Sequence, residues 1–377
     1  MNRQGGARLL LLGAGSVGAA AAKLAGKLSA LTAITVADRS QSAAASAAAA
    51  AGPRASAVQL DVIDRAGLLA LMRRHDVVLN CVGPYFRLAR PVFDAAFEAG
   101  IDYLDVDDDW QPTLELLGAD AAWREAGRTA ILGIGANPGL ANLAAVAAGR
   151  AVGKPERMVT GWTMPDQVGR EGSAEGEHWL FQSSGRIRLL ADGKLSEASP
   201  LAECMLDYPG IGRRAGLTVG HPEPITLPRA FPSLKECVNV MVLPGSLAAA
   251  LRYYAGLVDQ GRLDPSGAAE KMAQEYAPGS YATDLPDGPG FPGIFAIAES
   301  GDGRNRRHAA ARPKLPAVAG GMVAAAPLVA GLVLLLSGNV AGPGVLTPET
   351  AFDPEPFFAT LGLVTGAEGP MLELVGG

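Results

Sequence analysis

The sequence predicts an α/β protein, with a Rossmann doubly wound parallel sheet followed by a second α+β domain that has a mostly antiparallel sheet. Apolar runs alternate with helix-forming stretches over residues 1–140, an order typical of parallel sheets with right-handed crossovers. The first run, Leu9–Leu12, leads directly into a glycine-rich turn. The 377 residues also exceed what one compact core usually holds, which favours more than one domain.

Six strands are expected in the first domain, residues 1–140. The runs that predict them are Leu9–Leu12, Ile34–Ala37, Ala57–Asp61, Asp76–Val82, Tyr103–Val106 and Thr129–Leu132. Between them lie helical stretches such as the alanine run Ala43–Ala51. Because ligands bind beyond the carboxyl ends of strands in such sheets, the loops that follow the strands are the candidate site.

The turn Gly13–Gly18 has the Gly-x-Gly-x-x-Gly spacing of a dinucleotide site, and Asp38 follows about 20 positions later, after a second strand. Gly13 permits the tight turn, Gly15 lets a diphosphate approach the backbone, and Gly18 lets the helix pack on the strand. An ordinary glycine-rich turn is the alternative, but it does not require the strand, the helix and the acid together. The residues expected to bind the cofactor are Gly13, Gly15, Ser16, Val17, Gly18, Asp38, Arg39, Ser40, Asp61, Val82, Gly83, Pro84 and Asn137.

The choice between NAD and NADP depends on three consecutive residues. Asp38 would repel a 2′-phosphate and so favours NAD, whereas Arg39 and Ser40 are residues that a 2′-phosphate would attract. The sequence therefore predicts NAD or NADP as the cofactor, with a lean to NAD.

Composition excludes several classes of partner. The formal net charge of −6 and a pI near 5.4 argue against a broad basic surface for nucleic acid or anionic lipid. Cys81, Cys204 and Cys237 are scattered, which predicts neither a disulfide framework nor a structural zinc site. The first apolar run is too short for a secretory signal, so a cytoplasmic protein is expected.

One uncharged segment, Leu315–Gly338, is long enough to cross a bilayer. Pro316 and Pro327 interrupt it, and no aromatic belt or basic cluster marks a lipid boundary on its C-terminal side. A helix buried between two domains is also apolar all round. The sequence therefore predicts a buried interdomain helix, and no membrane span.

An acidic loop follows the fifth expected strand and contains Asp105, Asp107, Asp108 and Asp109. Such a loop could bind a metal ion or a cationic amine, but a solvated loop is the commoner outcome for a run of like charge. Because no histidine lies nearby in the sequence, no metal is predicted.

The pattern changes beyond about Met158. Short apolar segments separated by Gly and Pro predict a mostly antiparallel sheet in a second domain, residues 141–316, and helices follow in residues 317–377. The expected strands are Val159–Met164, Ile187–Ala191, Lys194–Leu195 and Cys237–Leu243, with a hairpin formed by Phe291–Glu299, a turn at Ser300–Gly303, and Arg306–Arg312. Helices are expected at Leu247–Gly261 and Pro265–Glu275.

With the glycine fingerprint, the segments Asn80–Tyr85, Ala99–Asp105 and Ile131–Leu140 make the chain resemble the saccharopine dehydrogenase-like superfamily. The likeness is greatest to its lysine 6-dehydrogenase and saccharopine reductase types, and it extends to Leu190–Lys194, Gly220–Leu234 and Gly344–Phe358. The resemblance implies hydride exchange between a nicotinamide and a C–N carbon of an amino acid or polyamine-like substrate. It also implies that the last helices return to the Rossmann domain, and we expect a homodimer.

Four residues are candidates for catalysis: His221, Glu223, Arg229 and Tyr85. His221 and Glu223 are fixed between prolines, which suits a proton donor or an amine-binding carboxylate, although a solvated surface loop is the alternative. Arg229 is suited to hold a substrate carboxylate or to form an interstrand salt bridge. The turn that contains Tyr85 is expected beside the nicotinamide, or is simply a rigid turn. His178, next to Trp179, is expected to be packed and hydrogen-bonded.

Two other functions remain compatible with the sequence. Relatives in the same superfamily include reductases that act in trans on the carbon–carbon double bonds of lipid intermediates, and the uncharged segment would suit such a substrate. A regulatory protein that binds NAD(P) without turnover is the third possibility.

Overall fold

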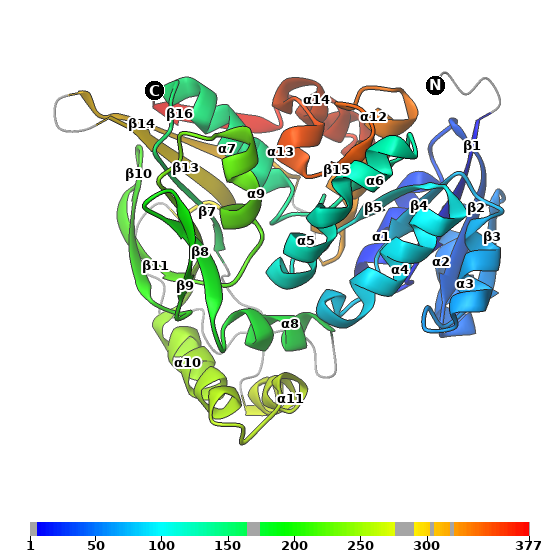
Figure 1. Cartoon of the computed structure of the whole chain (residues 1–377), viewed down its shortest axis with the longest axis horizontal. Coiled ribbons are helices and arrows are strands. Elements are labelled where there is room, and N and C mark those ends of the chain that lie inside the picture. The colour runs from blue at the N-terminus through cyan, green and yellow to red at the C-terminus, as the bar shows by residue number, and fades with distance from the viewer. Residues whose placement is uncertain (1–5, 164–173, 276–289, 302–304, 317–319, 377) are drawn as a thin grey trace. The chain divides into compact units, whose positions relative to one another are not determined.

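The computed structural model describes residues 6–163, 174–275, 290–301, 305–316 and 320–376 (Figure 1). Within the expected segments, Met164, Asp302, Gly303 and residues 317–319 therefore lie outside the described residues. The chain forms two compact units. The first contains residues 1–143 and 314–372, and the second contains residues 144–313 and 373–377.

The first unit is built on a seven-stranded sheet in which every neighbouring pair is parallel, with the order β15-β6-β5-β4-β1-β2-β3. Its strands are β1 Ala7–Leu12, β2 Leu31–Asp38, β3 Ala55–Gln59, β4 Val77–Asn80, β5 Asp102–Asp105, β6 Thr129–Ile131 and β15 Gly344–Leu346. The four leucines of β1 are fully buried, as expected for a sheet covered on both faces. The predicted Rossmann fold is confirmed, with one strand added at the edge.

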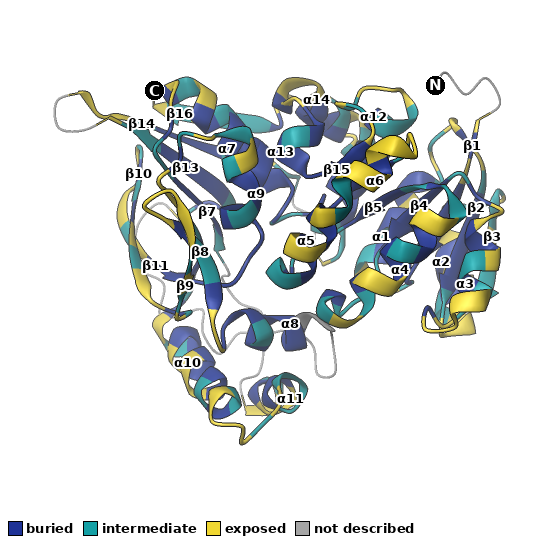
Figure 2. Cartoon of the chain, in the orientation of Figure 1, coloured by how far each residue is buried: buried dark blue, intermediate teal, exposed yellow. Residues whose placement is uncertain are grey.

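Helices cover this sheet, and Figure 2 shows dark blue strands behind helices whose outer faces are yellow. The helices of the first unit are α1 Ser16–Ala25, α2 Gln41–Ala51, α3 Arg65–Met72, α4 Tyr85–Ala99, α5 Trp110–Leu116, η1 Leu117–Ala119, α6 Asp120–Glu125, α12 Met322–Leu336, α13 Pro348–Ala351 and α14 Pro354–Thr365. The helix α7 Leu140–Val152 begins in the first unit and belongs mostly to the second. Local chemistry sets several of their ends. The Ser40 hydroxyl accepts from the Ala43 N–H at the start of α2, and Gly100 ends α4 in the left-handed conformation.

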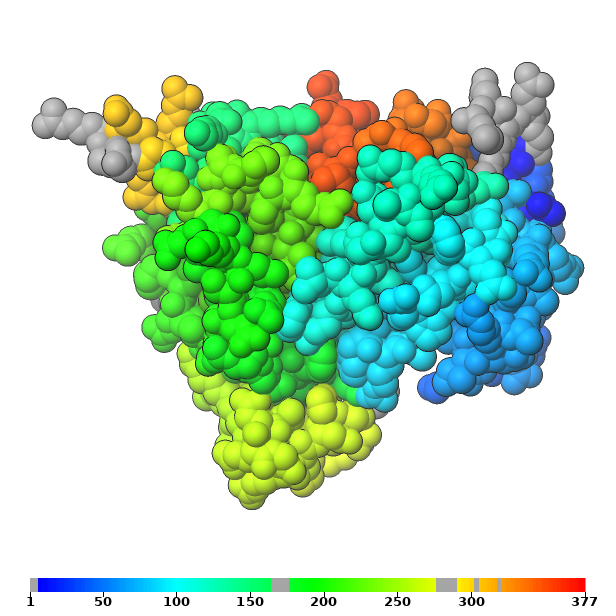
Figure 3. Space-filling view, in the orientation of Figure 1, coloured from blue at the N-terminus to red at the C-terminus, as the bar shows by residue number. Residues whose placement is uncertain are grey.

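The uncharged segment forms α12, which packs on α1, α14 and β5 of the first unit. These neighbours all belong to the same unit as α12, and the placement of the helix between two domains stays a prediction. Figure 3 shows the orange atoms directly against turquoise and cyan atoms. Within the described ranges, no helix combines the length and the apolar character needed to cross a membrane.

The second unit contains a nine-stranded mixed sheet that is mostly antiparallel, as predicted, with β7 and β12 as a parallel pair. Its strands are β7 Arg157–Thr163, β8 Ile187–Ala191, β9 Lys194–Ala198, β10 Glu203–Tyr208, β11 Gly212–Thr218, β12 Glu236–Val242, β13 Ile294–Ser300, β14 Arg307–Pro313 and β16 Leu372–Gly376. Its helices beyond α7 are α8 Ala174–Gln182, α9 Glu223–Ala230, α10 Gly245–Asp259 and α11 Pro265–Glu275. One apolar core joins α8, α10 and α11 to the sheet, and a second, on β7, β10, β12 and β13, contains Val159, Tyr208 and Phe295.

Candidate dinucleotide site and buried histidine–glutamate pair

The turn between β1 and α1 requires glycine at two positions. Gly13 has φ +87°, and a Cβ there would lie 2.7 Å from the carbonyl oxygen of Cys81. A Cβ at Gly18 would lie 1.8 Å from the carbonyl oxygen of Gly13. Both contacts are with backbone atoms, which cannot rotate away, so the turn exists only with these two glycines.

Gly15 differs, because no heavy atom lies within 4 Å of a Cβ built on it and the residue is exposed. It is the N-cap residue of α1, has no side chain to cap the helix, and no acidic residue follows in the first turn. A helix start of this kind leaves N–H donors and the positive end of the helix dipole for a ligand. The arrangement suits an anion such as a diphosphate.

Asp38 lies at the end of β2 and reaches the same turn. Its Oδ2 accepts from the Ala14 N–H at 2.7 Å, and its Oδ1 accepts from the Ser40 N–H at 2.8 Å. The residue is half-buried, while Arg39 and Ser40 are exposed. The carboxylate is therefore held beside the glycine turn, where a ribose would lie next to the diphosphate.

Ser16 has a partner far along the chain. The N–H of Gly321, next to the start of α12, donates to its hydroxyl at 2.9 Å. A Cβ at Gly321 would lie 2.3 Å from the carbonyl carbon of Ser16, so the two backbones meet closely. The C-terminal segment of the first unit thus abuts the first residue of α1.

The loop after β4 is held by buried side chains. Asn80 is fully buried, accepts from the Val82 N–H at 3.1 Å and donates to the Tyr103 hydroxyl at 3.0 Å. The Tyr85 hydroxyl donates to the Asn80 carbonyl oxygen at 2.8 Å, and burial raises the pKa of Tyr85 well above its ordinary value. Tyr85 therefore positions the loop that carries Val82, Gly83 and Pro84, and its catalytic role stays a prediction.

The acidic loop after β5 is not solvated, in contrast to the commoner outcome for a run of like charge. Asp105, Asp107 and Asp109 are buried, and burial raises the pKa of Asp105 to about 6. Hydrogen bonds compensate part of that cost, because Asp105 accepts from the Gly133 N–H at 2.6 Å and from the Tyr103 hydroxyl at 2.8 Å. Asp107 and Asp109 likewise accept backbone N–H groups, at 2.9 and 2.8 Å. The loop is a buried hydrogen-bonded network that holds the ends of β4, β5 and β6.

Three predicted cofactor residues remain: Val17, which is half-buried in the first turn of α1, Asp61 and Asn137. Asp61 is exposed after β3, and its carboxylate accepts from the Ile63 N–H at 3.1 Å, so it shapes a turn. Asn137 follows β6 and is half-buried, yet its amide nitrogen and oxygen are both buried without a hydrogen-bond partner. An unpaired carboxamide at this edge of the sheet offers one donor and one acceptor group to a ligand.

In the second unit, His221 and Glu223 form a buried pair. The Nδ1 of His221 and the Oε2 of Glu223 are 2.9 Å apart, and the side chains are 2% and 0% exposed. The segment continues β11 beyond its last strand residue, and Glu223 begins α9. The solvated loop that the sequence left open as an alternative is therefore wrong.

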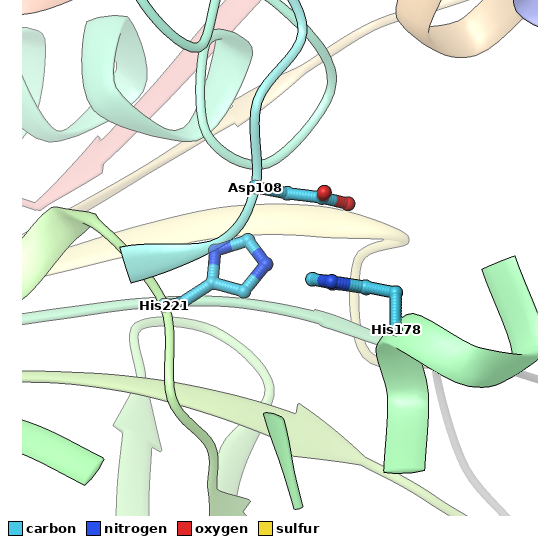
Figure 4. Close-up of side chains that lie close together, drawn as sticks. All are labelled: Asp108, His178 and His221. Atoms are coloured by element: carbon cyan, nitrogen blue, oxygen red, sulfur yellow. The ribbon is translucent and has the colours of Figure 1, made fainter. Parts of the chain in front are cut away.

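Aromatic side chains surround the pair. The Trp162 ring, on β7, lies 4.9 Å from the His221 ring, and the His178 ring, on α8, lies 5.9 Å from it. Figure 4 shows the His178 ring on its helix directed toward the His221 ring on its loop; the third side chain drawn, Asp108, belongs to the first unit. His178 is buried, as expected.

Arg229 is not brought to this pair. It is exposed in the last turn of α9, six residues after Glu223 and so about 120° around the helix from it. An interstrand salt bridge is excluded for Arg229, because it lies on a helix. At a helix C-terminus its charge interacts favourably with the helix dipole.

Several contacts of these sites could not be predicted from the sequence, because they join residues that are far apart along the chain. Asn80, Tyr103 and Asp105 meet although they are up to 25 positions apart, and Gly321 meets Ser16 from 305 positions away. The pair of glycines at 320 and 321 just before an uncharged helix was the available sign of a close backbone approach. Trp162 had no such sign, since only the strand register shows which face it occupies.

Comparison with known proteins adds three findings. The profile of the saccharopine dehydrogenase NADP binding domain matches residues 9–131. The carboxyaminopropylagmatine dehydrogenase of Synechocystis sp. is 24% identical over 393 residues, covering 94% of this chain and 95% of that protein. The structure of saccharopine dehydrogenase (L-Glu forming) from Saccharomyces cerevisiae matches with a TM-score of 0.63 and 16% identity, over 99% of this chain and 100% of that one, which shows a shared fold.

Proposed function

We propose that this chain is a nicotinamide-dependent dehydrogenase of the saccharopine dehydrogenase type, acting on a carbon–nitrogen bond of a small amine substrate, a proposal that the three similarities support. The observation that carries the proposal is the turn at α1. Two of its glycines are fixed by backbone contacts, and the third leaves the helix start accessible. A cradle of this shape fits a diphosphate, and an ordinary structural turn has no need of the open Gly15.

The residues of the first unit suit a dinucleotide along its length. Gly15 and the residues that start α1 would hold the diphosphate, and Asp38 would accept from the adenosine ribose. The loop from Val82 to Pro84 and the unpaired amide of Asn137 would hold the ribose and nicotinamide end, where a carboxamide can pair with another carboxamide. When bound, the cofactor carries the hydride, so the protein's part is binding, orientation and proton handling.

NAD is the cofactor we propose over NADP. Both oxygens of Asp38 accept backbone N–H groups, so its negative charge is fixed next to the expected ribose position. A 2′-phosphate placed there would meet that charge at short range. Arg39 is exposed beside Asp38, and its guanidinium is the group from which the 2′-phosphate of NADP would gain most binding energy.

His221 is the proposed proton acceptor. An amine must lose a proton from nitrogen before the adjacent carbon can lose hydride, and a neutral imidazole can take it near neutral pH. The Glu223 carboxylate can only accept a hydrogen bond, so the Nδ1 of His221 donates to it and Nε2 is left as the basic atom. Glu223 thereby fixes both the tautomer and the orientation of the ring.

The substrate class follows from the relative rather than from geometry. That protein is named for a dehydrogenase reaction on carboxyaminopropylagmatine, and we propose that this chain likewise acts on an amino acid or polyamine-like amine. We also propose a homodimer, which light scattering after size exclusion would test.

A screen of amino acids, diamines and imines with NAD and NADP in parallel, followed by absorbance of the reduced nicotinamide, tests the activity. We expect turnover of a basic amino compound, with His221→Asn reducing kcat by about 100-fold or more while cofactor affinity stays unchanged. The same substitution at His308, on β14, is the matched control and should leave kcat near the wild-type value. Turnover of an enoyl compound with no turnover of any amine would contradict the proposal.

A further inference from the structure

Only one of the two side-chain oxygens of Glu223 has a hydrogen-bond partner inside the second unit. Its residue exposure is 0%, and Oε2 pairs with His221 whereas Oε1 is buried with no hydrogen-bond partner. A carboxylate without full pairing is costly to bury. This free-energy cost of burying an unpaired carboxylate oxygen falls next to His221, the proposed base. Its position points to a ligand group that supplies the missing hydrogen bond.

Other residues of the second unit leave buried side-chain polar atoms unpaired too. Three of them are Gln182 with both amide atoms, Ser183 with its hydroxyl, and Asn239 with its amide oxygen. Backbone bonds tie two of these residues to the segment that carries the pair. The Gly220 N–H donates to the Gln182 carbonyl oxygen at 2.9 Å, and the Val219 N–H donates to the Asn239 carbonyl oxygen at 3.1 Å.

The strand register places the Asn239 side chain on the same face of the sheet as Trp162. Asn239 pairs with Thr160 across β12 and β7, and Trp162 is two positions along β7 from Thr160. The amide nitrogen of Asn239 donates to the Thr160 hydroxyl at 2.9 Å, which leaves its oxygen as the atom that needs a donor. Trp162 in turn lies against His221.

The unpaired atoms favour one kind of ligand group. Three of them are acceptors, the Oε1 of Glu223 and the amide oxygens of Asn239 and Gln182, whereas the Gln182 amide nitrogen is a donor. The Trp162 indole lies on the Asn239 face of the sheet and against His221. A positively charged nitrogen with several N–H donors satisfies such a set, because it supplies the donors, neutralises the carboxylate and is attracted by the aromatic face. An anionic or purely apolar group would leave Glu223 uncompensated.

We propose that Glu223 determines specificity by binding a second positively charged nitrogen group of the substrate, separate from the nitrogen whose bond to carbon reacts. The inference rests on the proposed function and names the substrate class: amines that carry a distal ammonium or guanidinium group. Oε2 orients His221, Oε1 binds the distal cation, and Asn239 supplies an additional acceptor.

Binding of three small amines to the full chain tests the inference independently of turnover. 1,4-Diaminobutane carries a distal ammonium, agmatine carries a distal guanidinium, and butylamine carries neither. By calorimetry we expect one or both dications to bind at least about 30-fold more tightly than butylamine, and Glu223→Gln to reduce that ratio to near one. Asn239→Ala should lower the ratio several-fold and serves if Glu223→Gln does not fold. The dication that binds more tightly identifies the group recognised.

His221→Asn separates this inference from the proposed function. That variant keeps the Glu223 charge, so we expect it to lose turnover and to keep the preference for dications. If His221→Asn retains turnover, the proton role fails and the specificity role stands. Equal binding of the three amines, no binding of any of them, or a preference that survives Glu223→Gln would overturn the specificity role.

Discussion

An alanine introduced by Gly18→Ala would place its Cβ 1.8 Å from the carbonyl oxygen of Gly13 and 2.8 Å from the carbonyl carbon. The backbone would have to separate by about 1.5 Å to restore ordinary contact. We expect this to lower the free energy of unfolding by about 1–3 kcal/mol, the usual cost of overpacking. Cofactor affinity should also fall, because α1 and the turn shift together.

Gly15→Ala acts on the same turn without that strain. No heavy atom lies within 4 Å of the added Cβ, and φ is −69°, which alanine adopts readily. We expect stability to stay within about 0.5 kcal/mol of wild type. The methyl group nevertheless projects at the helix start where a diphosphate would approach, so affinity should fall at least tenfold, or about 1.4 kcal/mol.

Fluorescence titration with NADH and NADPH measures affinity, and urea unfolding measures stability. Gly118→Ala is the matched control, because Gly118 is exposed, has open space around it and lies outside the turn. It should change neither quantity. Wild-type affinity in Gly15→Ala would refute the placement of the diphosphate, even if Gly18→Ala behaved as expected.

Three further predictions concern the first unit. Burial raises the pKa of Asp105 to about 6, above its value in the unfolded chain, so its contribution to stability is present at pH 4 and is lost as the pH rises through 6. The free energy of unfolding of the wild type, measured by urea titration relative to Asp105→Asn, should therefore decrease from pH 4 to above pH 6. A difference that stays constant with pH would contradict the shift in pKa. Tyr103→Phe removes the hydrogen-bond partner of the buried Asn80 amide nitrogen and of the buried Asp105 Oδ2, and should cost about 1–3 kcal/mol by urea unfolding, whereas a change below about 0.5 kcal/mol would show that the network relaxes. Asp38→Ala should raise the ratio of NADP to NAD use by about tenfold in kcat/KM, and an unchanged ratio would show that Asp38 does not contact the ribose.

The first sheet was predictable because its strands follow one another as apolar runs. Each of the six expected runs overlaps a parallel strand, and the glycine spacing identified the turn. The seventh strand was missed, since β15 has only three residues and pairs with β6 across more than 200 positions. Nothing local in Gly344–Leu346 distinguishes it from a loop.

The buried polar groups resisted prediction for a different reason. A run of aspartates predicts a solvated loop unless the backbone N–H groups that compensate the cost of burying the carboxylates are known. These N–H groups come from Gly133 and from the loop itself. Glu223 similarly looked like a loop residue because the prolines around it suggest exposure, although Pro222 and Pro224 instead flank the first residue of α9. Burial depends on tertiary contacts that hydrophobic periodicity does not encode.

The contact between Ser16 and Gly321 has a consequence for biosynthesis. During translation residues 1–143 emerge long before α12 and β15, and residues 144–313 of the second unit must be synthesised in between. In the nascent Rossmann sheet one side of α1 is therefore uncovered and the outer edge of β6 has no partner strand. A chaperone or an early-bound nucleotide could protect these exposed surfaces from aggregation. The first unit can close over its own beginning only after residues 314–372 have been synthesised.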